Sequence, residues 1–277
     1  MRAAAVQLQS TTDTEANLAS AERLVRAAAG DGAELVVLPE RLDIRGAAAD
    51  YAAGAEPLDG RPVSWARALA RELGIDLVAG SVAERREGRE RVSNTSVHVG
   101  PDAAIRATYR KIHMFDVEVG GVDYRESEHS EAADEIVLSE TAGGLGLGLT
   151  ICYDLRFPEL YRILTLRGAR IVTVPANFTR ITGEAHWEVL LRARAIENQV
   201  FVVAPGQARR PGPEGDSYGN SMIVDPWGEV LARAPADGEH VIAAELDLAR
   251  QDEVREKLPS LANRVDAAYR WPEGVTA

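Results

Sequence analysis

Residues 35–38, Leu-Val-Val-Leu, form an apolar run that has no polar face. Successive side chains of a strand point to opposite faces, so this run is typical of a strand that is covered on both sides. A sheet that is covered on both faces needs further layers of helix or sheet around it. This segment therefore predicts a layered fold, with residues 35–38 as a central strand.

The rest of the chain alternates short apolar runs with longer amphipathic segments. We expect helices where apolar residues recur every three or four positions, and strands where they are continuous or alternate. The predicted helices are residues 14–29, 63–73, 158–167, 184–197 and 249–258; the predicted strands are residues 3–8, 35–38, 75–79, 92–99, 104–110, 144–151, 171–174, 200–204, 222–224, 229–231 and 241–246. This alternation indicates the α/β class.

The domain organisation is predicted to be simple. The sequence has no internal repeat and no low-complexity block, and we expect residues 1–277 to form a single domain. The Pro- and Gly-rich residues 209–215 lie between predicted strands, so we interpret them as an exposed loop rather than a domain boundary. The stretch from about 259 to 277 is expected to be an extension that can reach a partner subunit.

Composition excludes several classes of function. The net charge of −12 disfavours nucleic acid as a partner, although acidity also serves solubility alone. The single cysteine allows no internal disulfide and favours a reducing compartment. The start of the chain does not read as a signal peptide, and no apolar run approaches the roughly 18 residues of a membrane span, so we expect no membrane association and a cytoplasmic location.

Polar residues follow the ends of three predicted core strands. Glu40 comes two residues after the apolar run 35–38, at the edge where open α/β sheets place their sites. Lys111 continues the core-facing row of Ile105, Ala107 and Tyr109, and an inward lysine needs a carboxylate partner or a chemical role. For each residue an ordinary alternative stays open: Glu40 could lie in water, and Lys111 could swing outward.

The third strand, residues 144–151, ends at Cys152. Its glycines share one face, which predicts close approach of another layer. A nucleophile between a strand and the helix that begins at Pro158 would have backbone N–H groups nearby to bind an oxyanion. A buried and inert thiol is the alternative. Together, Glu40, Lys111 and Cys152 predict an active site.

Other motifs do not survive inspection. Residues 215–219 match G-x-S-x-G, but a loop precedes them and a predicted strand follows, so they are not a nucleophile elbow. The glycines at 144–148 lack the spacing of a dinucleotide-binding loop. The histidines show no ligand spacing, so we predict no metal and no cofactor, and we interpret His113 as structural.

Three blocks in order resemble the nitrilase superfamily of carbon–nitrogen hydrolases. They are Leu38-Pro39-Glu40, residues 109–113 (Tyr-Arg-Lys-Ile-His) and residues 151–159 (Ile-Cys-Tyr-Asp-Leu-Arg-Phe-Pro-Glu). The resemblance implies an α-β-β-α sandwich of two mixed sheets, with Glu40, Lys111 and Cys152 as the catalytic triad. It also implies a second catalytic-site glutamate, Glu126, after a loop at 119–123 that lacks an expected proline.

Residues 181–197 and the blocks 218–222 and 225–228 are similar to the Nit branch of that superfamily, which includes deaminated glutathione amidase and ω-amidase. The resemblance implies cleavage of a small ω-amide of a dicarboxylic or α-keto acid through a thioester on Cys152, with the Tyr153 backbone N–H as an oxyanion donor. The family also implies a homodimer, or a higher homo-oligomer, that pairs through the helices after Pro158 and Gly183.

The residues that we expect to bind substrate are Asn177, Phe178, His186 and Arg156, with Arg180, Arg192 and Arg194 as further cationic candidates. An N-carbamoyl amino acid hydrolase is the first alternative function. A catalytically silent binding protein on the same fold is an alternative of another class.

Overall fold

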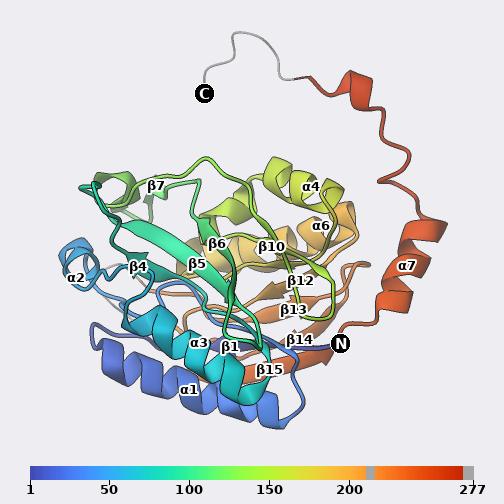
Figure 1. Cartoon of the computed structure of the whole chain (residues 1–277). Coiled ribbons are helices and arrows are strands. Elements are labelled where there is room, and N and C mark those ends of the chain that lie inside the picture. The colour runs from blue at the N-terminus through green and yellow to red at the C-terminus, as the bar shows by residue number, and fades with distance from the viewer. Residues whose placement is uncertain (210–215, 271–277) are drawn as a thin grey trace.

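Two β-sheets lie face to face, and helices cover the outer face of each (Figure 1). The computed structural model describes residues 1–209 and 216–270. The first sheet has the order β15 (His240–Glu245), β1 (Arg2–Gln7), β2 (Leu35–Val37), β3 (Asp76–Val78), β5 (Ser93–Val99), β4 (Val82–Glu84), and β6 (Ile105–Arg110) pairs with β5. The second has the order β14 (Val230–Arg233), β13 (Met222–Val224), β12 (Phe201–Ala204), β11 (Ala169–Thr173), β10 (Gly146–Leu149), β9 (Leu138–Glu140).

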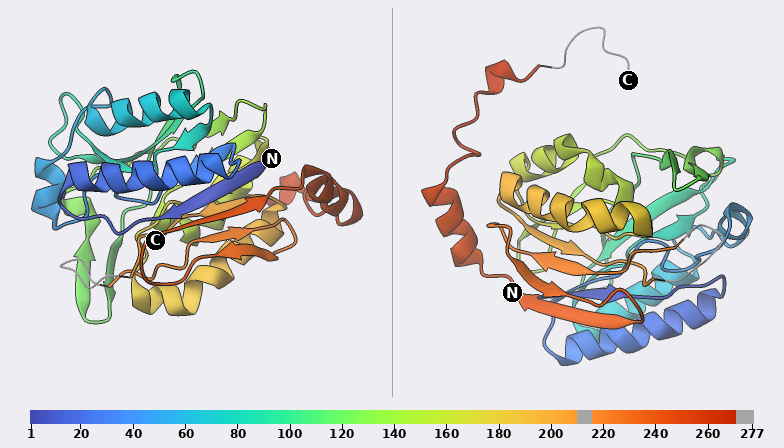
Figure 2. Two further views of the ribbon diagram at one scale, coloured as in Figure 1. Left: turned by 90° about the horizontal axis from the view of Figure 1, so that it is seen from below. Right: turned by 180° about the vertical axis from the view of Figure 1, so that it is seen from behind.

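The helices form the two outer layers. On the first sheet lie α1 (Thr14–Gly30) and α3 (Arg61–Leu73), and on the second lie α4 (Pro158–Leu166) and α6 (Glu188–Asn198), as the right view of Figure 2 shows. Shorter helices are α2 (Ala48–Ala53) and α5 (Arg180–Thr182), and α7 (Leu248–Lys257) follows β15. The predicted α/β sandwich is confirmed.

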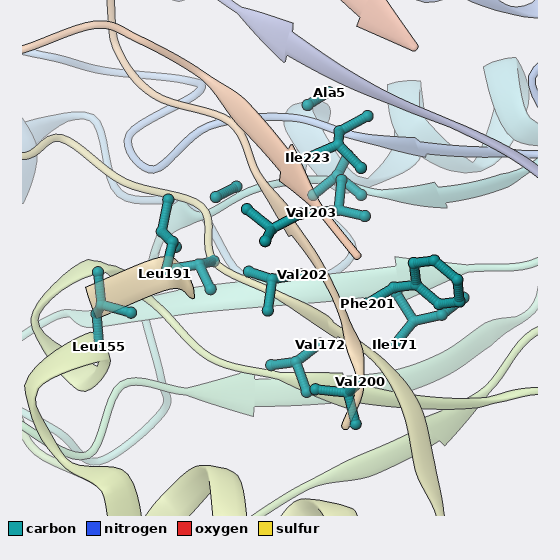
Figure 3. Packing of buried hydrophobic residues seen from close by; sticks show 14 of the residues in the cluster. Ala5, Leu155, Ile171, Val172, Leu191, Val200, Phe201, Val202, Val203 and Ile223 are labelled. Carbon is teal, nitrogen blue, oxygen red and sulfur yellow. The ribbon is translucent and has the colours of Figure 1, made fainter. Parts of the chain in front are cut away.

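Side-chain alternation along the central strands builds the layers. In β1, Ala3 and Ala5 belong to the cluster between the sheets, whereas Ala4 and Val6 pack beneath α1 and α3. The run 35–38 alternates in the same way, so both of its apolar faces are used. Figure 3 shows Ala5 on the side of Ile223, a residue of the second sheet. Small alanines at this interface let the two sheets approach closely.

Local signals set the ends of the helices. Asp13 caps α1 by accepting a hydrogen bond from the Ala16 N–H at 3.1 Å, and Gly74 ends α3 in the left-handed region at φ 68°. Pro158 opens α4 where its missing N–H costs nothing. Gly148 of β10 lies beneath α4, where an added Cβ would meet Leu164 at 3.1 Å. The close approach predicted for the glycine face is therefore confirmed.

Several predicted boundaries were wrong. The strand predicted at 144–151 is shorter, because the backbone turns after Leu149 toward the 3-10 turn Cys152–Arg156. The helix predicted at 184–197 is preceded by α5 and a π-helical turn, Gly183–Trp187, so helical backbone begins at Arg180. The loop at 119–123 is the turn of a hairpin, β7 (Asp116–Val119) and β8 (Val122–Arg125), because two glycines supply the positive φ angles that a tight turn needs.

Three strand ends meet at one edge of the fold. β2 is parallel to β3, which is antiparallel to β5, which in turn is antiparallel to β6. The chain therefore leaves β2 and β6 in the same direction, and Glu40 and Lys111 emerge at the same edge. The second sheet brings the end of β10, and with it Cys152, to face them.

The chain after α7 leaves the body of the fold. Residues up to 270 extend away from the two sheets and include a short 3-10 turn, Asp266–Ala268 (Figure 1). The predicted extension 259–277 falls partly outside the described residues, as does most of the predicted loop 209–215. Within the described residues, no helix has both the length and the apolarity needed to cross a bilayer.

Candidate active site

Cys152 occupies a sharp turn directly after the core strand β10. Its φ angle is +47°, in the left-handed region that residues with a Cβ rarely adopt. The turn is held by the Cys152 N–H, which donates to the Pro175 carbonyl at 2.8 Å, and by the 3-10 turn that follows. Cys152 is 8% exposed and lines a pocket. Strained backbone at an accessible side chain is a common feature of functional sites.

Glu40 faces Cys152 from the first sheet. Its Oε2 accepts a hydrogen bond from the Asn177 N–H at 2.7 Å, and burial and the charge of the same carboxylate raise the pKa of the neighbouring Cys152 thiol. Gln207 donates from its side chain to the Glu40 carbonyl at 2.9 Å, which fixes the backbone of the turn. Both residues therefore lie where a proton can pass from the sulfur to the carboxylate.

Lys111 is buried between two carboxylates. Its Nζ lies 2.7 Å from Glu126 Oε2 and 3.2 Å from Glu40 Oε1, and the lysine is 2% exposed. The Phe115 N–H donates to the same Glu126 oxygen at 2.8 Å. The structure thus places Lys111 inward, as the side-chain alternation predicted, and brings Glu40, Lys111, Glu126 and Cys152 into one cluster.

Asn94 of β5 also belongs to this cluster, and the sequence did not single it out. Its Nδ2 donates to Glu40 Oε1 at 2.8 Å and to Glu126 Oε1 at 3.3 Å. Its backbone carbonyl accepts the backbone N–H of Lys111 at 2.9 Å. The Asn94 side chain therefore joins the two carboxylates, while its main chain fixes the backbone of Lys111. Every residue of β5 is buried and most are polar, so no feature of the pattern marked Asn94.

The charges in the cluster assign the resting proton positions. Burial alone would raise the pKa of Glu40, but the Lys111 and Arg41 cations hold it below its usual value. Burial and the Glu40 charge raise the pKa of the Cys152 thiol well above its usual value, against the opposing effect of Lys111. Burial acts to lower the pKa of Lys111, yet the two carboxylates raise it above its ordinary value. The resting site is therefore a thiol, a carboxylate and an ammonium.

The cluster opens into a pocket of about 470 Å³. This volume suits a small metabolite. The side chains around it come from both sheets, the β7–β8 hairpin and the segment before α5; the lining residues are Glu40, Arg41, Ala47, Ala48, Lys111, Phe115, Val122, Asp123, Tyr124, Arg125, Glu126, Glu128, His129, Cys152, Tyr153, Asn177, Phe178, Thr179 and Thr182.

The predicted substrate-binding residues divide into two groups. Asn177 and Phe178 line the pocket, as does Tyr153, the predicted oxyanion donor. Arg156 and His186 do not line it: Arg156 Nη1 lies 3.2 Å from His186 Nδ1, and its guanidinium lies 5.2 Å from the centre of the Phe178 ring. Arg156 therefore supports a lining side chain from behind.

The other cationic candidates are engaged elsewhere. Arg180 pairs with Glu184 and Asp216, Arg192 donates to the Gly228 carbonyl, and the buried Arg194 donates to the Leu155 carbonyl. The arginines that do line the pocket are Arg41 and Arg125, neither of which the sequence suggested. Arg41 directly follows Glu40, and its guanidinium lies 4.8 Å from the centre of the Tyr51 ring.

Two arrangements resemble serine-hydrolase features without supporting that chemistry. In the rejected G-x-S-x-G motif, whose first glycine lies outside the described residues, Ser217 donates to Asn177 Oδ1 at 2.5 Å, and strand β13 follows it. His98 contacts Ser139 Oγ through Nδ1 at 2.7 Å and Asp76 Oδ1 through Nε2 at 3.1 Å. All three residues are buried and none lines the pocket. They connect β9 of one sheet with β5 and β3 of the other.

Metal ligation finds no support in the described part of the chain, where no group of three or more His, Cys, Asp or Glu side chains is placed to hold an ion. In the pocket cluster, which consists of Glu40, Asn94, Lys111, Glu126 and Cys152, the carboxylates are already paired with Lys111 and Asn94.

Comparison with known proteins gives the family. The carbon-nitrogen hydrolase family model matches residues 2–256. This chain belongs to the carbon–nitrogen hydrolase family. Its activity is therefore hydrolysis of carbon–nitrogen bonds other than peptide bonds. The sandwich, the triad blocks and the pocket cluster agree with this assignment.

Individual relatives are similar over nearly the whole chain. A deaminated glutathione amidase of Homo sapiens is 41% identical, covering 96% of this chain and 83% of its own length. Omega-amidase NIT2 of Danio rerio is 36% identical, covering 97% of this chain and 96% of its own length. The predicted resemblance to the Nit branch is thus confirmed.

Solved structures agree in fold. The NitFhit protein of C. elegans is 38% identical with a TM-score of 0.88, covering 97% of this chain and 66% of that longer chain. A mutant of the amidase from Nesterenkonia sp. AN1, 25% identical with a TM-score of 0.77 over 94% of this chain and 98% of its own, shows acrylamide added at its active-site cysteine. That neighbour supports a cysteine-dependent amidohydrolase.

Proposed function

We propose that this chain hydrolyses a small ω-amide of a dicarboxylic or α-keto acid to the carboxylate and ammonia, through a thioester on Cys152. The observation that supports this most directly is the pocket cluster, in which a thiol, a carboxylate and a buried ammonium converge at the base of a cavity of metabolite size. The relatives named for deaminated glutathione and for ω-amides support the same substrate class.

The first step follows from the resting proton positions. Because the pKa of the Cys152 thiol is raised and that of Glu40 is lowered, the thiol carries its proton until attack begins. Glu40 accepts that proton as the sulfur bonds to the amide carbon. The developing oxyanion is stabilised by Lys111 and the Tyr153 backbone N–H, and one such donor is typically worth about 3–4 kcal/mol.

The second step releases the products. Glu40 passes its proton to the amide nitrogen, and ammonia leaves the tetrahedral intermediate to give the thioester. Water then attacks the thioester carbon while Glu40 accepts its proton, and the carboxylate product departs as the thiol is restored. Glu126 and Asn94 hold Lys111 and Glu40 in place throughout, through the contacts at 2.7, 2.8 and 3.3 Å.

We propose Arg41 as the contact for the distal carboxylate of the substrate. It lines the pocket, adjoins Glu40 in sequence, and its ring contact with the buried Tyr51 orients the guanidinium. Arg125, the other lining arginine, is 2.7 Å from Asp123 and is largely exposed, so it is the poorer anchor. Arg156 and His186, which the sequence suggested as substrate contacts, are proposed instead to position the ring of Phe178.

The first test is ammonia release from a panel of amides with and without a distal carboxylate. Cys152→Ala should abolish turnover, and an acyl adduct on the wild-type thiol should be found by mass. Arg41→Gln should raise KM for carboxylate-bearing amides more than for neutral amides, with Arg125→Gln as the matched control. Because Arg41 also lowers the pKa of Glu40, a change in kcat common to both kinds of amide is expected beside this difference in KM. Faster ammonia release from N-carbamoyl amino acids would instead favour the carbamoylase alternative, and no thiol reactivity would favour the silent binding protein.

We further propose that the chain forms a homodimer through α4 and α6. Ile163 and Leu166 of α4 and Val189 and Ile196 of α6 are exposed at 37%, 50%, 66% and 44%, an apolar surface on the outer layer. The extension after α7 is proposed to contact the partner subunit. A cytoplasmic location is supported by the single free thiol. Sedimentation of the full chain, with Val189→Glu as the disrupting variant, tests the dimer.

A further inference from the structure

One fully buried carboxylate connects the lysine segment to the cysteine turn. Asp154 is 0% exposed, and its Oδ2 accepts hydrogen bonds from the Tyr109 hydroxyl at 2.6 Å and from the Ile151 N–H at 2.8 Å. Its Oδ1 accepts from His113 Nδ1 at 2.7 Å. The proposed mechanism gives Asp154 no role, although it is the most completely buried acid beside the pocket cluster.

The spacing of these partners gives the contacts their meaning. Tyr109 lies in β6 and His113 lies beyond its end, each two residues from Lys111, and both side chains reach Asp154. Ile151 directly precedes Cys152, and Asp154 follows it within the same 3-10 turn. The Asp154 carboxylate therefore contacts one residue on each side of Lys111 in the chain, Tyr109 and His113. It also bonds the N–H of the residue that precedes Cys152, so it fixes the turn that carries the sulfur.

The surroundings keep this connection rigid. The His113 ring stacks on Phe157 with centroids 3.5 Å apart and planes within 5°. Tyr109 is 0% exposed and lies in the apolar cluster between the sheets. A carboxylate that accepts three short hydrogen bonds away from water has little freedom to move, because each broken bond would leave a buried polar group unpaired.

We propose that Asp154 is a positioning residue that sets the distance between the Lys111 ammonium and the Cys152 sulfur. Lys111 and Cys152 come from different sheets and share no direct backbone hydrogen bond among those described. Glu40 interacts with both reacting side chains, and Asp154 adds a second connection, between the chain segments that carry them. The inference rests on the proposed function in so far as Cys152 is the nucleophile. It adds a residue that acts through the catalytic groups without touching substrate.

The physical consequence concerns the reacting geometry. Lys111 acts on the charge that develops during attack, and a displacement of about 1 Å at such a site can cost about 100-fold in rate. Loss of a single donor to Asp154 loosens the link only in part, so we expect a decrease of about tenfold in kcat with KM within twofold of wild type. A purely structural contact would lower thermal stability without changing kcat of the folded protein.

The experiment compares three conservative variants of the full chain. Tyr109→Phe deletes one side-chain donor to Asp154, and His113→Phe deletes the second while keeping an aromatic ring against Phe157. The backbone N–H donors of Ile151 and His113 remain in both variants. Tyr161→Phe is the matched control, because Tyr161 is also a fully buried tyrosine, yet its hydroxyl lies 3.1 Å from Thr150 Oγ1 and does not bond Asp154. Each variant is assayed for kcat, KM, melting temperature and the rate of Cys152 alkylation by iodoacetamide across pH.

Alkylation reports the site without any assumption about the substrate. Lys111 lowers the pKa of the Cys152 thiol, so a displaced ammonium should shift the rate-versus-pH curve to higher pH and slow alkylation at neutral pH about tenfold. We expect this shift in Tyr109→Phe and His113→Phe, and a wild-type curve in Tyr161→Phe.

Wild-type kcat and alkylation in the folded Tyr109→Phe and His113→Phe variants would overturn the proposal. Equal losses in Tyr161→Phe would also overturn it, because the effect would then be general to buried hydroxyls in this region. If Tyr109→Phe does not fold, His113→Phe, whose side chain lies nearer the surface, decides by the same criteria. If the wild type releases no ammonia from any amide, the proposed function fails, but the alkylation comparison still decides the role of Asp154.

Discussion

Replacing Lys111 by methionine should reverse the sign of the pH dependence that the active-site carboxylates contribute to the stability of this protein. Lys111 is one of two lysines in the chain, and methionine keeps its length while removing its charge. At 2.7 and 3.2 Å and an effective dielectric of about 20, its attractions to Glu126 and Glu40 amount to about 6 and about 5 kcal/mol before desolvation is subtracted. Breaking a buried pair of this kind typically costs about 3–5 kcal/mol.

The sign of the pH dependence follows from the two carboxylates. In the wild type the folded pKa of Glu40 is lowered, so its contribution to stability is present above the unfolded value and is lost as pH falls through the folded value. Without the ammonium, two buried carboxylates face each other, and the pKa of one must rise above its unfolded value of about 4.3. That contribution is full below the unfolded pKa and is lost as pH rises through the folded one.

Urea unfolding at pH 5.0, 6.5 and 8.0 is the assay. We expect Lys111→Met to lose about 3–5 kcal/mol of unfolding free energy at pH 8.0 and to recover part of it by pH 5.0, while kcat falls about 100- to 1,000-fold. Lys257→Met is the control, since the Lys257 side chain is 73% exposed, and should match wild type. The Asp43 contribution is common to both proteins, so the difference in unfolding free energy between Lys111→Met and wild type is compared at each pH. A difference that grows on acidification, or wild-type turnover in the variant, would refute the reasoning.

Four further predictions concern other parts of the molecule. Asn94→Leu removes the amide that joins Glu40 and Glu126 and should lower kcat about tenfold with unchanged KM in steady-state kinetics, because a hydrogen bond to a charged group is worth about 1.5–3 kcal/mol. Glu40→Gln keeps an oxygen acceptor but no base, so ammonia release should fall by about 100- to 10,000-fold, and near-normal turnover would assign the base elsewhere. Gly148→Ala places a Cβ 3.1 Å from Leu164 and should lower the unfolding free energy by about 1–3 kcal/mol in urea, with kcat of the folded protein unchanged. Burial raises the pKa of Asp43 to about 7, so its protonation contributes stability that is full below about pH 4 and is lost as pH rises through 7. In Asp43→Asn the urea midpoint should therefore change less with pH over that range, and a pH dependence equal to that of wild type would contradict this prediction.

Most of the layers could be predicted from the sequence because buried faces require apolar residues at regular spacing. The run 35–38 showed both apolar faces of a central strand, and the alternation through Ile105, Ala107 and Tyr109 correctly predicted an inward Lys111. The motif blocks then predicted which distant residues would meet, and the cluster contains Glu40, Lys111, Glu126 and Cys152 as expected.

What the sequence could not supply depends on loops and on uniformly buried strands. Asn94 lies in a strand buried along its whole length, so no change of pattern marked it. The β7–β8 hairpin consists of two four-residue strands, too short for a clear period, and it contributes a wall of the pocket. The sequence suggested Arg156 as a substrate contact, whereas Arg41 is the arginine that lines the pocket beside Glu40. The direction of each side chain depends on the turn that carries it, and the left-handed backbone of Arg41, with a φ of 58°, could not be foreseen from the sequence.

The left-handed backbone at Cys152 lowers the conformational stability of the protein at its most reactive residue. A residue with a Cβ in the left-handed region carries about 1–2 kcal/mol of conformational energy that glycine avoids. Cys152→Gly removes the sulfur and also relieves this backbone strain, whereas Cys152→Ala removes the sulfur and keeps the strain. An inert protein on this fold would therefore be more stable with glycine at position 152, and the cysteine found there trades that stability for a reactive side chain.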